Sequence, residues 1–185
     1  MRAKKTSAAF DWEQVARLAL TSRAIDEIEE NELVPAGKVV YQFSANGHEL
    51  SQILLGLSLT HAHDGATVYY RSRPFMLANG FTAQEAFAAS MALTGSPSEG
   101  RDVGVVFSMP PRTGATVLPS SGDVGAQYTP AAGWAQAITY YQNVLKDKEW
   151  RNAIAVVLGG DGSVATNGFW AALTIATTLE LPMLF

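Results

Sequence analysis

The pattern with the most specific chemistry is Gly159–Ser163, which reads GGDGS. It follows a short aliphatic segment, residues 152–158, that reads as a buried strand, and it precedes an uncharged segment, residues 167–179, that reads as a helix. Glycines let a backbone approach a ligand closely, and a helix start offers N–H groups and a positive dipole end to a phosphate. The carboxylate of Asp161 suits a hard cation such as Mg²⁺ that bridges to phosphates. Gly-Asp-Gly is also an ordinary turn, so the pattern alone names no ligand.

A second cluster of polar groups is Tyr69–Arg73, which reads YYRSR. Arginine binds phosphate or carboxylate groups through two parallel hydrogen bonds, and the tyrosine and serine hydroxyls add further donors. Two arginines this close together in a charge-poor chain favour an anion site. A surface loop with an aromatic anchor is the alternative.

The loop Pro119–Gln127 (PSSGDVGAQ) also leads into a predicted helix start. Its serines are not surrounded by the Gly-x-Ser-x-Gly pattern of a nucleophile elbow, so positioning by the backbone is favoured over a nucleophilic serine.

The histidines are weaker candidates. His61 and His63 could form a metal pair, but the chain has no cysteine and no evident third ligand. Loop histidines that contact solvent or substrate are therefore favoured. His48 lies at a predicted helix start, where the neighbouring Glu49 complements the helix dipole.

The helices that must position these residues are predicted from capping residues and hydrophobic periodicity. Asp11 caps the first helix, Thr82 and Glu85 form a capping box, and Thr129 caps a later helix with Pro130 at its first position. The inner stripe of the first helix is predicted to be Val15, Leu18, Ser22, Ile25 and Ile28. The predicted helices span residues 12–31, 49–60, 82–94, 129–145 and 167–179.

This order of elements predicts an α/β fold, a parallel sheet flanked by helices, with a ligand at the carboxyl ends of the strands. Residues 1–46 are predicted to form an N-terminal helical extension and residues 47–185 an α/β domain. Residues 96–127 form a long Gly-, Pro- and Ser-rich segment, of the kind that is either functional or disordered. The last strand–helix–strand unit stops within its final strand, at Met183–Phe185. We therefore expect a chain that is truncated at its C-terminus.

Composition excludes several classes of protein. Hydrophobic residues make up 48% of the 185 residues and charged residues 16%, which excludes a disordered chain. The net charge of −4 argues against a nucleic-acid binder. The absence of cysteine excludes disulfides, thiolate metal sites and a cysteine nucleophile. No apolar stretch is long enough to cross a membrane, and the basic start has no signal-peptide core, so a cytoplasmic location is expected.

Charge is also unevenly distributed. Residues 102–145 and 152–185 carry very few charged side chains. This indicates surface that is covered by more chain or by another subunit. The alternative is an ordinary core lined with Ala, Ser and Thr.

Taken in order, these motifs resemble the α subunit of the thiamin-diphosphate-dependent 2-oxo acid dehydrogenases, the E1 component, a family that includes the pyruvate, branched-chain and acetoin enzymes. The resemblance runs from about Leu18 to Phe185, and its specificity lies in the ordered set rather than in any one motif. The motifs that carry it are Arg23–Glu27, Gly47–Glu49, Tyr70–Arg73, Ser120–Ser121 with Gln127 and Pro130, Gly160–Gly162, and Leu181–Phe185.

The resemblance implies a role for each matching residue. Asp161 would be a Mg²⁺ ligand, and Tyr70 and Arg71 would bind the diphosphate of thiamin diphosphate. Arg112 would face the substrate or the equivalent of the family's phosphorylation loop. Ser121 and Val124 would contact the rings of the cofactor. Three further residues would shape the diphosphate site: Gly160, Gly162 and Ser163.

The resemblance also implies partners. These are a β subunit or β domain of E1, which supplies the glutamate that activates the cofactor, and a lipoyl-bearing E2 acyltransferase, in a hetero- or homo-oligomer. The reaction would decarboxylate a 2-oxo acid, pyruvate or a branched-chain one, and pass the acyl group to the lipoyl domain. The sequence leaves open which 2-oxo acid is used and whether the α and β parts are fused.

The sequence departs from the family pattern in three places. The second metal ligand of the family, an asparagine, would lie beyond Phe185. The family's Met-Pro-x-His loop reads Met109–Arg112 (MPPR), without the histidine, and the acidic patch expected after Gly-Asp-Gly reads Ala165–Gly168 (ATNG). The chain alone is therefore expected to bind cofactor weakly and to be inactive.

Three other readings stay open at this stage. A transketolase-like or acetolactate-like thiamin enzyme is disfavoured by Tyr70–Arg73. A non-catalytic α/β module that binds phosphate or a partner chain, and a gene fragment without independent function, are the remaining two.

Overall fold

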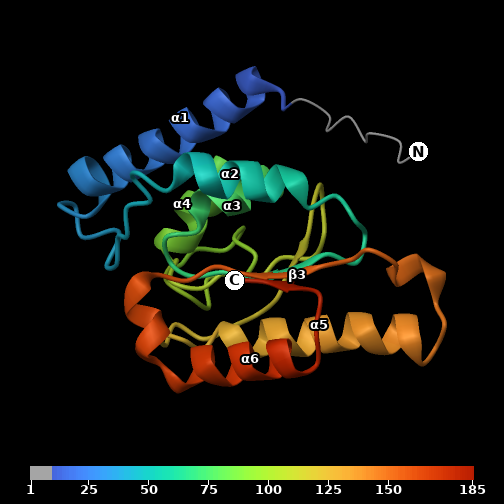
Figure 1. Cartoon of the computed structure of the whole chain (residues 1–185). Helices are drawn as coiled ribbons and strands as arrows, with labels where there is room; N and C mark the ends of the chain where they lie inside the picture. Colours follow the sequence, from blue (N-terminus) through green and yellow to red (C-terminus); the bar gives the residue numbers. More distant parts are fainter. Residues whose placement is uncertain (1–9) are drawn as a thin grey trace.

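A computed structural model describes residues 10–185 (Figure 1). The basic start noted in the sequence, residues 1–9, lies outside the described residues. At the centre is a parallel sheet of four short strands in the order β2-β1-β3-β4. The strands are β1 (Gly65–Thr67), β2 (Thr116–Val117), β3 (Ala155–Val157) and β4 (Met183–Leu184). The predicted α/β fold with a parallel sheet is confirmed.

Helices cover both faces of the sheet (Figure 1). One layer holds α1 (Trp12–Ile28), α2 (Glu49–Ser58), α3 (Arg73–Ala78) and α4 (Ala83–Ser90), with α1 packed on α2 and α3. The opposite layer holds α5 (Tyr128–Asn143) and α6 (Asn167–Thr178), which lie against each other. Two short 3-10 helices lie between these elements: Lys148–Trp150 precedes β3, and Asp161–Ala165 precedes α6. No helix within residues 10–185 is long and apolar enough to span a membrane.

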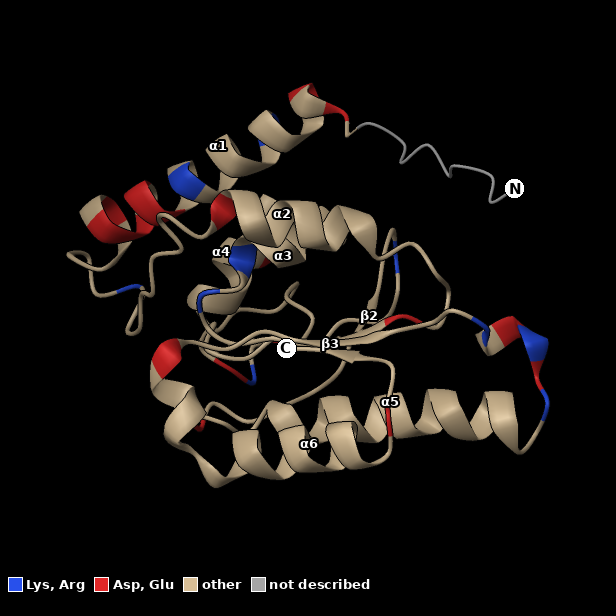
Figure 2. Cartoon of the chain, in the orientation of Figure 1, with Lys and Arg blue, Asp and Glu red and all other residues tan. Residues whose placement is uncertain are grey.

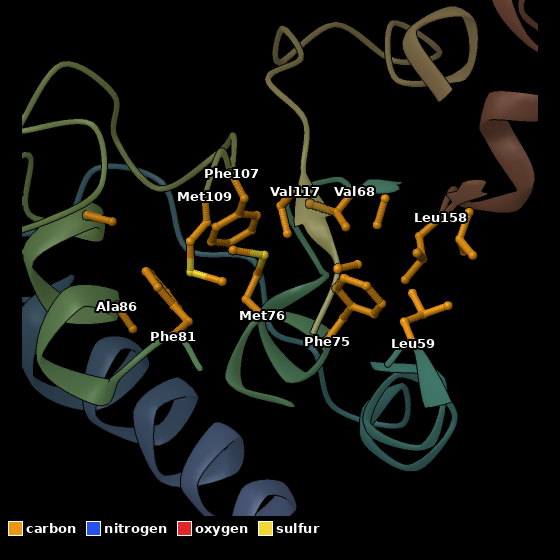
Figure 3. Close-up of a cluster of buried hydrophobic side chains, with 14 of the residues drawn as sticks. Leu59, Val68, Phe75, Met76, Phe81, Ala86, Phe107, Met109, Val117 and Leu158 are labelled. Carbon is orange, nitrogen blue, oxygen red and sulfur yellow. The ribbon is translucent and has the colours of Figure 1, made fainter. Parts of the chain in front are cut away.

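The alternation of side chains along β3 divides the core into two parts. Val156 faces the α2–α4 layer, where it joins Phe75, Met76 and other large side chains (Figure 3). Ala155 and Val157 face the α5–α6 layer, where Tyr128, Ile138 and Leu181 are buried together with many small residues. The buried alanines of these two helices are Ala131, Ala132, Ala135, Ala172 and Ala176.

The parallel strands bring three loops to one edge of the sheet. The segments that follow β1, β2 and β3 are residues 68–72, 118–127 and 158–166. They contain the three motifs with predicted chemistry, so the sheet topology assembles the motifs in one place.

The first helix differs from its prediction. After Ile28 it widens into a π-helix, Glu29–Leu33. Ile28 is exposed, so its place in the predicted inner stripe is wrong, whereas Asp26 and Glu29 are buried. The reason is that Arg73 on α3 forms ion pairs with both carboxylates and draws this face of the helix inward.

Helix α3 was not predicted, because Arg73–Ala78 is short and follows a segment that reads as a loop.

The capping box of Thr82 and Glu85 is confirmed, but α4 ends at Ser90 rather than near residue 94. The helix cannot continue because Ala92 adopts a left-handed conformation with φ 55°.

Helix α5 begins two residues earlier than predicted. Gln127 is its N-cap residue, so Thr129 lies in the first turn and is not the cap. The other predicted helices agree with the structure to within about two residues at each end. The domain boundary expected after residue 46 stays a prediction.

Candidate functional site

A cavity of about 490 Å³ lies at the carboxyl ends of the strands. We call it the strand-end cavity. All eight residues given a binding role by the sequence line it: Tyr70, Arg71, Ser121, Val124, Gly160, Asp161, Gly162 and Ser163. Its other lining residues are His48, Val68, Tyr69, Val105, Gly122, Asp123 and Gln127. The topology thus brings together three motifs that lie far apart in the chain.

A buried tyrosine of α5 fixes the position of the Gly-Asp-Gly turn through hydrogen bonds. The Ser163 hydroxyl donates to the carbonyl of Gly160 at 2.5 Å, so the Tyr128 hydroxyl is the donor in the 2.5 Å contact between Tyr128 Oη and Ser163 Oγ. A Cβ added at Gly159 would lie 2.1 Å from Tyr128 Oη. The turn therefore requires glycine at position 159 and has one fixed position relative to α5.

The turn itself opens toward the cavity. A Cβ added at Gly160 or at Gly162 would meet no protein atom within 4 Å. The space above both glycines is therefore available to a ligand that approaches the backbone. The carboxylate of Asp161 lies between them and forms no ion pair with any described residue.

The helix predicted over residues 167–179 is α6, which begins at Asn167 as expected. A 3-10 helix that the sequence did not predict, Asp161–Ala165, lies between the turn and α6. The side chain of Thr166 caps α6 by accepting a hydrogen bond from the Phe169 N–H at 3.4 Å. The N–H groups near the cavity therefore belong to the glycine turn and its 3-10 helix, not to the first turn of α6.

Arg71 reaches the cavity from the loop after β1. One of its N–H groups donates to the Ser44 carbonyl at 2.7 Å, and its guanidinium lies 5.4 Å from the ring centre of Tyr70. The Arg71 carbonyl accepts a hydrogen bond from the side-chain amide of Gln52 at 3.2 Å. Both ends of the residue are fixed, and four of its five N–H donors make no hydrogen bond to the described residues. Arg71 is suited to bind an anion.

Arg73, the other arginine of the second motif, does not reach the cavity. Its guanidinium is buried between α1 and α3, where it pairs with Asp26 and Glu29. The donor cluster predicted from YYRSR is therefore divided between two sites.

The loop after β2 supplies the third wall. Ser121 and Asp123 bond to each other, since Ser121 Oγ donates to Asp123 Oδ2 at 3.1 Å and accepts from the Asp123 N–H at 3.2 Å. Val124 is exposed in the cavity wall and offers an apolar surface. Gln127 ties the loop to the sheet, because its carbonyl accepts from Thr67 Oγ1 at 2.7 Å and its amide donates to the Leu158 carbonyl at 3.2 Å.

Several lining residues lay outside the predicted set. His48 precedes α2, and the Gly-His-Glu pattern at this helix start is the feature of the sequence that could have identified it as a lining residue. Tyr69 adjoins the predicted pair, and burial raises the pKa of its phenol above the ordinary value. Gln127 belonged to the family motif but had no assigned role.

The remaining candidates lie elsewhere. His63 stacks on Trp150 with ring centres 4.0 Å apart, and both His61 and His63 precede β1, at the edge of the sheet opposite to the cavity. Arg112 pairs with Glu85 at 2.7 Å and lines no part of the cavity. These three residues therefore lie outside the strand-end cavity, and the substrate contacts suggested for them stay predictions.

The metal-binding potential of the site is limited to Asp161 and its surroundings. Residues 10–185 contain no group of three or more His, Cys, Asp or Glu side chains that could hold a metal ion. Mg²⁺, however, is often bound by one or two carboxylates together with the phosphates of a ligand. The donor set of the turn fits a metal that arrives with a diphosphate.

The family model described as Dehydrogenase E1 component matches residues 16–185. The match includes every lining residue of the strand-end cavity and all the secondary structure after the first turn of α1.

Proposed function

Because the chain belongs to the family of the dehydrogenase E1 component, the thiamin-diphosphate-dependent part of 2-oxo acid dehydrogenases, we propose that the strand-end cavity binds the diphosphate of thiamin diphosphate together with Mg²⁺. The full enzyme would decarboxylate pyruvate or a branched-chain 2-oxo acid and transfer the acyl group to a lipoyl domain of E2. The observation that carries this proposal is the convergence of eight residues from three motifs on one cavity.

Each wall of the cavity has a part in the proposed binding. Arg71 donates hydrogen bonds to the phosphate oxygens, and the turn from Gly160 to Gly162 admits the diphosphate close to its backbone. Asp161 is the protein ligand of Mg²⁺. Tyr70 holds the Arg71 guanidinium over its ring. This division suits a dianionic group bound to a hard cation.

The opposite wall would contact the rings of the cofactor. Val124 supplies apolar surface and Ser121 a hydroxyl, while Ser163 holds the glycine turn in shape through Gly160. When bound, thiamin diphosphate supplies the carbanion chemistry of decarboxylation. The residues of this chain bind and orient it and shield one side of it from water.

The uncharged α5–α6 layer supports the proposed partner. Neither helix carries an acidic or basic residue (Figure 2), yet α6 exposes the large side chains of Trp170, Ile175 and Leu179. An exposed apolar face of this kind marks a protein interface. We assign it to a β subunit or β domain of E1, which would bring the activating glutamate to the open side of the cavity. The cytoplasmic location expected from the sequence stays a prediction.

The test is binding of thiamin diphosphate to the chain, measured by calorimetry with and without Mg²⁺. We expect Mg²⁺ to tighten binding, Asp161→Asn to abolish that dependence, and Arg71→Gln to weaken binding about tenfold or more, as for loss of a hydrogen bond between charged groups. Arg112→Gln is the matched control, because it removes an arginine outside the cavity. If neither Mg²⁺ nor Asp161→Asn changes the affinity for thiamin diphosphate, the result would instead favour a module that only binds phosphate.

A further inference from the structure

A buried ion cluster joins the first helix to α3. The Arg73 guanidinium pairs with Asp26 and, at 2.7 Å, with Glu29, and all three side chains are less than 10% exposed. One guanidinium thus forms ion pairs with two carboxylates in the interior of the protein. Such clusters commonly serve only to pack two helices together, but here one carboxylate has a second set of partners.

The second oxygen of Asp26 holds the loop that leads to α2. Asp26 Oδ2 accepts hydrogen bonds from the Ala45 N–H at 2.8 Å and from the Ser44 hydroxyl at 3.0 Å. The Ala45 N–H is completely enclosed, since Ala45 has no exposed surface. A charged acceptor in such a place forms strong and directional bonds.

The same peptide group meets Arg71 on its other side. The Ala45 N–H and the Ser44 carbonyl belong to one planar peptide unit, so fixing one fixes the direction of the other. Asp26 binds the N–H, and the carbonyl accepts the 2.7 Å hydrogen bond from Arg71 Nη1. A carboxylate bonded to the N–H also polarises the unit and makes its carbonyl a better acceptor.

We infer that Asp26 is a positioning residue for Arg71: through the Ser44–Ala45 peptide group it fixes the guanidinium where the strand-end cavity receives an anion. The inference rests on the proposed function, because it concerns how that anion is bound. It gives the first helix a part in ligand binding although no residue of the helix lines the cavity.

A merely structural role for Asp26 predicts a different result. Loss of packing would lower stability and would weaken binding equally whether or not Arg71 is present. Positioning predicts that Asp26 matters only while Arg71 is there to be positioned. A double-mutant cycle separates the two cases.

The experiment measures the affinity of the chain for inorganic pyrophosphate by calorimetry. Asp26→Asn keeps the size of the side chain but presents an amide where two donors and a guanidinium need a carboxylate. We expect about a tenfold loss of affinity in the wild-type background and no further loss in the Arg71→Gln background. Equal losses in both backgrounds, or no loss in either, would overturn the inference.

Two further variants complete the design. Ser44→Ala removes the hydroxyl that donates to Asp26 and accepts from the Asn46 N–H at 3.2 Å, but it leaves the Ser44–Ala45 peptide group in place. It therefore keeps the test valid if Asp26→Asn does not fold. It should cost roughly threefold in affinity, again only with Arg71 present, and equal losses would count against positioning. Val15→Ala weakens the packing of α1 on α2 away from the loop and should leave affinity unchanged. A pyrophosphate affinity unaffected by Arg71→Gln would reject the proposed function itself, and the inference with it.

Discussion

The two helical layers of the protein are built from different interactions. The layer of α1–α4 contains buried ion pairs in addition to its apolar core, and every ion pair within residues 10–185 lies in this layer or joins it to a neighbouring loop. The α5–α6 layer has no charged side chain in either helix (Figure 2). The strand-end cavity is lined by loops that lead into both layers, since the loop that carries Arg71 leads into α3 and the glycine turn leads toward α6.

The difference shows in how each wall is positioned. Arg71 is fixed by hydrogen bonds that originate in a buried carboxylate. The glycine turn is fixed by the uncharged hydrogen bonds of Tyr128 and Ser163 and by close packing, because Gly159 touches Tyr128. Close packing also places α6, where Gly168 approaches the carbonyl of Gly125. The first wall should therefore be sensitive to loss of charge and the second to any gain in volume.

The largest effect is expected from Arg73→Ala. This change leaves Asp26 and Glu29 buried without a cation, which typically costs about 3–5 kcal/mol of unfolding free energy. Urea denaturation measures the loss. Arg112→Ala breaks a half-exposed pair on the same layer and should cost less than about 1 kcal/mol. Similar costs for the two variants would mean that burial does not distinguish the ion pairs.

The second layer is tested by adding a methyl group. Gly168→Ala would bring a Cβ to 2.3 Å from the Gly125 carbonyl oxygen, a backbone atom that cannot rotate away. We expect a loss of about 1–3 kcal/mol, measured by thermal or urea unfolding. Gly133→Ala is the control, because its Cβ meets nothing within 4 Å. That change should stabilise α5 by about 0.5–1 kcal/mol, and destabilisation by it would contradict the steric interpretation.

The smallest effect is the pH dependence of the Arg112–Glu85 pair. The guanidinium hydrogen bond lowers the pKa of Glu85 from 4.5 to about 2. Since the folded-state pKa is depressed, the pair stabilises the fold above about pH 4.5 and loses that contribution as the pH falls toward 2. The pair is partly exposed, so its contribution should be at most about 1 kcal/mol.

This pH dependence is measured against Glu85→Gln. The stability difference between wild type and variant should be constant above pH 5 and should shrink below it. A difference that does not change between pH 5 and pH 2.5 would show that the pair contributes nothing to stability.

The two layers also differ in how far the sequence predicts them. The α5–α6 layer follows from local signals: an aliphatic strand, a glycine turn and uncharged helices. In the α1–α4 layer, Asp26 and Glu29 lie outside the predicted inner stripe of the first helix. Only the tertiary contact with Arg73 makes them interior residues, and that arginine itself lies in a helix too short to show periodicity.

The lining residues of the strand-end cavity also differ in how far the sequence predicts them. The eight predicted lining residues were found because each lies in a motif of unusual composition, and parallel topology requires such motifs to converge. Val68 and Val105 carry no such signal, since apolar residues beside a strand are ordinary core. The division of Arg71 and Arg73 between two sites depends on the turn into α3, which no local pattern specifies.

The strand order has a consequence for the route by which the protein folds. The central strand β1 pairs with two strands that come much later in the chain, since Gly65 lies opposite both Thr116 and Ala155. Both pairings must close long loops before they gain any stability, which slows folding relative to a helical protein of the same length. The individual helices can form early and locally. The strand-end cavity, by contrast, exists only after the last of these distant pairings is made, so the ability to bind a ligand is among the final properties that the folding chain acquires.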